Sequence, residues 1–223
     1  MTINKDDLLN SILESIGRIE SIKLEDIPNI DLYMDQVTTF MDRKLKATTR
    51  KPDEDKILTK TMINNYAKND LLPPPVKKKY SKEHILMLIF IYYCKGMLSI
   101  NDIQMLLNPI AERYFQKTDE PNLSSIYEEV FGMEEERIND LKKDIIEKFE
   151  MSQKTFTDVP EEDRESLQLF SFIFMIGYDV YVKKLLLEKL IDTYQDATTK
   201  QTKEPEKQPK QTKEKPGKEK PAK

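Results

Sequence analysis

The part of the chain that decides the fold lies between residues 58 and 107. It opens with Leu58-Thr-Lys-Thr-Met-Ile-Asn-Asn-Tyr66, continues through Leu71-Leu-Pro-Pro-Pro-Val-Lys-Lys-Lys-Tyr80, and closes with Gly96-Met-Leu-Ser-Ile-Asn-Asp-Ile103. In order, this stretch predicts a short polar helix, a proline-rich exit, a basic cluster, a buried helix and a further helix. It therefore predicts a small helical unit that presents a cationic surface.

The short polar helix is predicted over residues 58 to 67. Thr59 is a candidate cap, because its hydroxyl can accept a bond from an otherwise unpaired backbone N–H. Asn69 and Asp70 tolerate the left-handed conformation that ends helices. The three prolines at 73 to 75 then force an extended segment.

The next helix is predicted over residues 82 to 95, with Ser81 as its cap. Its run from Ile85 to Tyr93 is apolar on nearly every side, which is typical of a helix at the centre of a domain. Ser99 and Asp102 resemble a capping box and begin another helix. We expect Asn108-Pro109 to end or kink that helix.

Composition and helical spacing predict an all-α fold for the whole chain. The 223 residues include only five glycines and no tryptophan, and 38% of them are hydrophobic, enough for a real core. Ser125 with Glu128 is a further candidate capping box. Other helices are predicted over residues 6–22, 32–45, 133–151 and 163–193, and the last has a wide apolar face long enough for a partner helix.

The formal net charge of -4 conceals an uneven distribution. Residues 43 to 82 contain 12 Lys or Arg and 4 Asp or Glu, and residues 200 to 223 contain 9 Lys and 4 Glu. A local basic patch attracts polyanions whatever the total charge is. The first block is therefore a candidate nucleic-acid surface, and we interpret the second as solvated surface.

The candidate contacts to double-stranded DNA come from the short helix and the basic cluster after it. Amide and ammonium groups reach base edges in a major groove, and Lys and Thr contact phosphates. Tyr66 either contacts a phosphate or packs between helices. The predicted contact set is Thr59, Lys60, Thr61, Asn64, Tyr66, Lys68, Lys77, Lys78, Lys79 and Tyr80.

This order of elements resembles the DNA-binding half of the MerR family of transcription regulators. Tyr66 falls on the second tyrosine of that family's recognition stretch, and Tyr80 falls on the tyrosine that ends its basic wing. The resemblance implies a winged helix-turn-helix and a sequence-specific regulator. The chain departs from the pattern at Asn64, which replaces an arginine, at Asp70, which replaces a glycine, and in its short wing without glycine.

A closer resemblance covers about residues 25 to 150. The motifs Ile30-Asp-Leu-Tyr-Met-Asp-Gln-Val37, Leu58 to Tyr66 and Leu71 to Tyr80 are similar to those of domain of unknown function 1836, an uncharacterised family of low-GC Gram-positive bacteria. That resemblance implies kinship and no activity.

The sequence predicts four regions. They are an amino-terminal helix over 1–30, a winged helix-turn-helix DNA-binding domain over 31–108, a helical dimerisation or effector region over 109–195, and a disordered Lys-rich tail over 196–223. The tail has little apolar content, so it cannot offset the entropy of ordering.

Several other classes of protein are excluded at this level. One cysteine and one histidine exclude an intrachain disulfide and most zinc chemistry, so we interpret Cys94 as a core residue and His84 as a local hydrogen-bonding residue. No nucleophile elbow, phosphate loop or metal motif occurs, and we expect no enzyme, cofactor or metal site. The first residues lack the apolar core of a signal peptide, and no apolar run suits a bilayer, which predicts a cytoplasmic protein.

Two functions remain open from the sequence. The first is a DNA-binding regulator, with a homodimer and a small-molecule effector as further partners. The second is a protein-interaction adaptor that keeps the fold without binding DNA. A segment covering the outer face of the short helix, such as the amino-terminal helix, would favour the adaptor.

Overall fold

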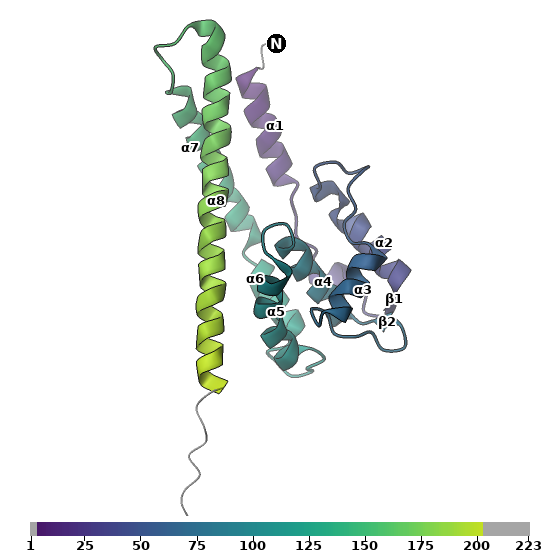
Figure 1. The fold of residues 1–223 in the computed structure, drawn as a ribbon. Helices are drawn as coiled ribbons and strands as arrows, with labels where there is room; N and C mark the ends of the chain where they lie inside the picture. Colours follow the sequence, from purple (N-terminus) through teal and green to yellow (C-terminus); the bar gives the residue numbers. More distant parts are fainter. Residues whose placement is uncertain (1–3, 203–223) are drawn as a thin grey trace, which may run out of the picture.

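The computed structural model describes residues 4–202, which are mostly helical (Figure 1). This agrees with the predicted all-α class, with one pair of two-residue strands added. In chain order the elements are α1 (Lys5–Gly17), a 3-10 helix (Leu24–Asp26), β1 (Leu32–Tyr33), α2 (Met34–Leu45), a 3-10 helix (Lys46–Thr48), α3 (Lys60–Lys68), β2 (Lys79–Tyr80), α4 (Lys82–Cys94), α5 (Ile100–Tyr114), α6 (Leu123–Phe131), α7 (Glu134–Gln153) and α8 (Glu161–Thr202).

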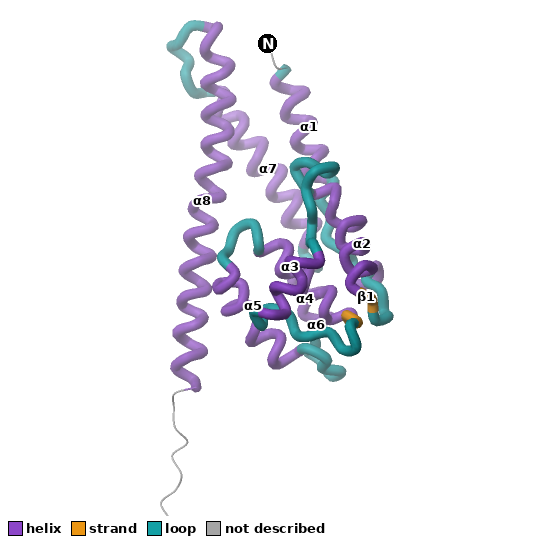
Figure 2. The backbone as a smooth tube through the Cα atoms, turned by 45° about the vertical axis from the view of Figure 1, so that its right-hand side comes forward, coloured by secondary structure: helices purple, strands orange, loops and turns teal. Residues whose placement is uncertain are grey.

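The elements form two parts that lie side by side (Figures 1 and 2). Helices α2 to α6 and both strands make a compact body. Helices α1, α7 and α8 run along one side of it, and α8 also contacts α5. No helix in the described part of the chain combines the length and the apolar character needed to cross a membrane.

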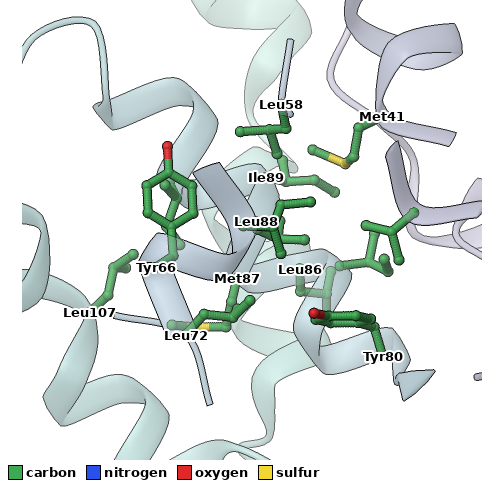
Figure 3. Packing of buried hydrophobic residues seen from close by; sticks show 14 of the residues in the cluster. Met41, Leu58, Tyr66, Leu72, Tyr80, Leu86, Met87, Leu88, Ile89 and Leu107 are labelled. Atoms are coloured by element: carbon green, nitrogen blue, oxygen red, sulfur yellow. The ribbon is translucent and has the colours of Figure 1, made fainter. Parts of the chain in front are cut away.

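Helix α4 is the centre of the body. Its residues 86 to 89 are completely buried, and Figure 3 shows them among Met41 of α2, Tyr66 of α3, Tyr80 of β2 and Leu107 of α5. Each fully buried apolar side chain of this size contributes about 1.5 to 3 kcal/mol. The all-round apolar sequence of α4 is thus explained by neighbours on every side.

A second, smaller core joins the long helices. Ile145 and Phe149 of α7 pack with Phe172 of α8, and the two rings meet edge to face at 5.3 Å between centroids. The apolar face of α1 covers this cluster with Leu9, Ile12, Leu13 and Ile16. The amino-terminal helix therefore packs on α7 and α8.

Pro109 does not end α5, so the first of the two sequence expectations, an end or a kink at Asn108-Pro109, is wrong. The helix continues to Tyr114, because Leu107 before the proline and Ile110 and Ala111 after it all pack against the main core. That packing outweighs the roughly 3 kcal/mol that an internal proline costs.

Three other boundaries differ from the sequence prediction. The cap of α6 is Asn122, whose side-chain oxygen accepts from the N–H groups of Ser124 and Ser125, so Ser125 is the third helical residue and not the cap. Helix α1 ends at Gly17, and Ile22 enters the main core instead. Helix α8 continues beyond residue 195 to Thr202, and the rest of the predicted disordered tail, 203–223, lies outside the described residues.

Candidate nucleic-acid interface

Helix α3 has one buried face and one exposed face. Thr59 caps it as predicted, with its hydroxyl oxygen accepting a 3.2 Å bond from the N–H of Met62. Ile63 and Tyr66 point into the main core. The opposite face is open to solvent along the whole helix and consists of Lys60, Thr61, Asn64, Asn65 and Lys68.

The exit from α3 is fixed by backbone geometry. The carbonyl of Asn65 accepts from both the backbone N–H and the side-chain amide of Asn69, at 3.0 and 2.8 Å. Asp70 then takes a positive φ of 54°, the left-handed conformation that commonly ends a helix. Leu71 and Leu72 enter the core directly after it and anchor this end of α3.

The basic cluster forms a tight reversal that we call the lysine turn, Val76–Lys79. Val76 and Lys79 exchange both backbone hydrogen bonds, at 3.1 and 2.9 Å. The two residues between them, Lys77 and Lys78, have φ of 50° and 64°, as a type I′ turn requires. Both side chains are exposed at the tip.

The lysine turn and α3 are held on the same support, helix α2. Strands β1 and β2 pair antiparallel, with Leu32 opposite Tyr80 and Tyr33 opposite Lys79, and β1 leads directly into α2. Helix α2 contacts α3 as well as β2. The two basic elements are therefore positioned relative to each other by packed structure, and Figure 1 shows them at the same end of the body.

Two predicted contacts lie in the core. Tyr66 is 6% exposed and Tyr80 is 3% exposed, so both rings are packing residues. Burial raises the pKa of both phenols, which keeps them protonated. Tyr80 packs edge to face on His84, with 5.4 Å between the ring centroids. The sequence pattern identified these tyrosines by position but not by burial, which is decided by α4 and α5.

Three other predicted contacts are engaged within the protein. Thr59 is half-buried and serves as the cap. Lys60 forms an ion pair with Asp35 of α2. Lys79 is half-buried, and its ammonium lies 5.3 Å from the centroid of the Tyr33 ring.

The structure brings together a smaller set of exposed candidates than the sequence predicted. Thr61, Asn64 and Lys68 lie on the outer face of α3, and Lys77 and Lys78 lie at the tip of the lysine turn.

Two residues of this region were missing from the predicted contact set. Tyr33 is 54% exposed at the base of the lysine turn, where it contacts Lys79. Asn65 is exposed beside Asn64. For Tyr33 the available signal was an aromatic residue just before a predicted helix, which is too common to indicate a site.

His84 has a structural role beside this region. Its Nδ1 atom accepts a 3.0 Å bond from the backbone N–H of Ser81 and completes the cap of α4. Burial lowers the pKa of the imidazole, so the ring is neutral near pH 7. Among residues 4–202, no group of three or more His, Cys, Asp or Glu side chains is placed to hold a metal ion.

The geometry defines a mostly helical protein whose exposed short helix and tight basic turn share one scaffold. Residues 22–130 match the family described as domain of unknown function (DUF1836). No curated protein and no solved structure matches the chain. The family span includes α2, α3, the lysine turn, α4, α5 and nearly all of α6, and it ends before the long helices.

Proposed function

We propose that this protein is a sequence-specific DNA-binding transcription regulator with a MerR-like winged helix-turn-helix. Helix α3 lies in the major groove, and the lysine turn contacts the adjacent backbone. The observation that supports this is the exposed face with Asn64 and Lys68, fixed by α2 in a constant position relative to Lys77 and Lys78.

The two basic elements have different roles in this proposal. Lys77 and Lys78 neutralise phosphates, so they supply affinity that depends steeply on salt through counterion release. Asn64 supplies specificity, because an asparagine amide pairs with both N6 and N7 of adenine. In this proposal Tyr66 and Tyr80 anchor α3 and the lysine turn to the core and do not contact DNA.

The adaptor alternative receives support from one feature only. Asp35 is largely exposed and pairs with Lys60, which weakens the positive potential at the start of α3. The expected cover over α3 is not formed by the amino-terminal helix, since α1 packs on α7 and α8. The exposed amide-bearing face therefore favours DNA over a protein partner.

The test of the proposed function begins with selection of binding sites from random duplexes, followed by titration of the enriched site at several salt concentrations. We expect Lys77→Glu/Lys78→Glu to weaken binding to all sequences and to reduce the slope of log K against log salt by about 2. The control is Arg137→Glu on α7 combined with Lys154→Glu at the residue that follows α7, which changes the net charge equally. Unchanged binding by the lysine-turn variant would refute the assignment of the turn.

Specificity is tested separately with Asn64→Ala. We expect a roughly 5-fold to 150-fold loss for the enriched site and little change for a scrambled duplex, from the value of about 1 to 3 kcal/mol for a bidentate base contact. Failure to enrich any site, together with salt-insensitive binding, would favour the adaptor.

A further inference from the structure

The two strands and the lysine turn form a small ribbon with an inner and an outer face. Leu32 and Tyr80 lie opposite each other where β1 pairs with β2, and both are buried, at 5% and 3% exposed. Successive side chains along a strand point to opposite faces of the sheet. The next opposed pair, Tyr33 and Lys79, therefore lies on the outer face of the ribbon, away from the core.

A third residue extends this outer face on the other side of β2. Val76 pairs with Lys79 on the side away from β1, so its side chain points to the same face as that of Lys79. Tyr33, Lys79 and Val76 thus lie next to one another across the ribbon, and we call them the outer ribbon row. With about 4.8 Å between neighbouring strands, the row is roughly 10 Å wide.

The outer ribbon row holds a lysine between two exposed apolar side chains. Tyr33 is 54% exposed and Val76 is 59% exposed, whereas Lys79 between them is half-buried. The backbone N–H and C=O of Lys79 both bond to Val76, so Tyr33 faces Lys79 as a non-hydrogen-bonded pair, the kind in which side chains lie closest. The Lys79 ammonium accordingly lies 5.3 Å from the centroid of the Tyr33 ring.

Tyr33 is also fixed by the helix that follows it. Its backbone N–H donates a 2.9 Å bond to Oε1 of Gln36, in the first turn of α2. Side chains that are already held in place lose less conformational entropy when a partner binds. The row therefore presents a phenol, which can donate a hydrogen bond, beside a positioned ammonium.

We propose, on the basis of the proposed function, that the outer ribbon row contacts the sugar–phosphate backbone of duplex DNA. The DNA interface then extends from the lysine turn to β1. The Tyr33 hydroxyl donates to a phosphate oxygen, the Lys79 ammonium pairs with a phosphate, and the Val76 side chain packs on a deoxyribose. Tyr33 and Val76 are uncharged, so their part of the affinity does not depend on counterion release.

Charge on the ribbon favours a polyanion over a protein partner. Lys77 and Lys78 continue the outer face to the tip of the turn, which places three cations on one small ribbon. Two carboxylates flank β1, those of Asp31 and Asp35, and Asp35 is already paired with Lys60. An apolar protein surface on the outer ribbon row would desolvate lysines without giving them partners. Duplex DNA supplies a phosphate for each of them.

The first experiment separates the phenol from the charges by titrating the enriched duplex at several salt concentrations. We expect Tyr33→Phe, which keeps the ring beside Lys79, to weaken binding roughly 10-fold with the same slope of log K against log salt. Lys79→Gln should reduce that slope by about 1. Tyr178→Phe removes an exposed phenol of α8 and should leave both affinity and slope unchanged.

The outcomes of this experiment separate the outer ribbon row from the proposed function. If wild type binds duplex DNA and Tyr33→Phe binds equally well, the contact by the phenol is refuted and the proposed function stands. A loss confined to Tyr33→Ala would show that the ring only positions Lys79, which also refutes the contact. If wild type binds no duplex, both proposals fail.

The second experiment adds a charge to the row. Val76→Lys places a further ammonium against the DNA backbone, so we expect a slope steeper by about 1. Met151→Lys adds the same charge at an exposed position of α7 and should leave the slope unchanged. Thermal unfolding checks that both variants remain folded. An unchanged slope for Val76→Lys, or an equal change in both variants, overturns the proposed contact.

Discussion

Helices α4 and α8 both carry large apolar residues on opposite faces, yet they have different fates in the single chain. Helix α4 is enclosed by α2, α3, β2, α5 and α6, and its side chains are buried in every direction. Helix α8 is covered along the side that carries Phe172, and large apolar residues on its other side, such as Phe170, Phe174 and Tyr181, stay exposed. The comparison shows that apolar residues on all sides of a helix favour burial on every side. They do not determine whether segments of the same chain provide that cover.

The largest expected effect separates the two faces of α8. Phe172 is 2% exposed and Phe174 is 64% exposed, although they are the same residue type two positions apart. We expect Phe172→Ala to lower the free energy of unfolding by about 3 to 5 kcal/mol, and Phe174→Ala to change it by less than about 0.5 kcal/mol. Urea titration at concentrations where the chain is monomeric measures both. Similar losses for both variants would contradict the one-sided burial of α8.

An intermediate effect on the unfolding free energy comes from His84, a buried titratable residue of α4. Burial lowers the pKa of His84 below its usual value of 6.5, so the unfolded chain binds a proton more readily. The free energy of unfolding is therefore highest above pH 6.5, where His84 is neutral in both states. It decreases as pH falls from 6.5 toward the folded-state pKa. The slope is at most about 1.4 kcal/mol per pH unit.

The matching variant for this effect is His84→Gln, which keeps an acceptor at the third helical position of α4. Unfolding is measured from pH 7.5 to 5 for both proteins. We expect the variant to have a flatter pH profile below 6.5, and identical profiles would argue against a depressed His84 pKa.

The smallest expected effect lies in the lysine turn, outside both helices. Lys78 has a positive φ of 64°, which costs a side-chain-bearing residue about 1 to 2 kcal/mol, whereas glycine loses roughly 0.5 to 1 kcal/mol of entropy. We therefore expect Lys78→Gly to raise the unfolding free energy by about 0.5 to 1 kcal/mol while weakening DNA binding. Lys68→Gly, within helical α3, should instead lower stability by about 1 kcal/mol. A loss of stability in Lys78→Gly would show that the turn is not strained.

Local signals in the sequence predicted several parts of the interface correctly. Thr59 caps α3, Asp70 takes the left-handed conformation after it, and Ser99 with Asp102 forms the capping box of α5. These features were predictable because they depend on a side chain and the backbone within a few residues of it.

Other features depend on contacts between distant residues and were not predictable. The sequence places Tyr80 among the DNA contacts and leaves Tyr66 open between a phosphate contact and packing, and both rings are buried in the main core. The sequence predicts an end or a kink at Asn108-Pro109, but tertiary packing continues the helix to Tyr114. Lys60 was assigned to DNA without its partner Asp35, which lies on another helix.

The sequence by itself determined the helical class, most helix ends, the basic character of residues 43–82 and the presence of a buried helix, predicted over 82–95 and observed over 82–94. Only the tertiary structure decided which tyrosines are buried, how α2 joins α3 to the lysine turn, and which side of α8 faces away from the chain. The physical reason is the separation in sequence of the residues that interact. Caps and turns depend on hydrogen bonds between residues that are close in sequence, whereas burial depends on contacts between distant segments.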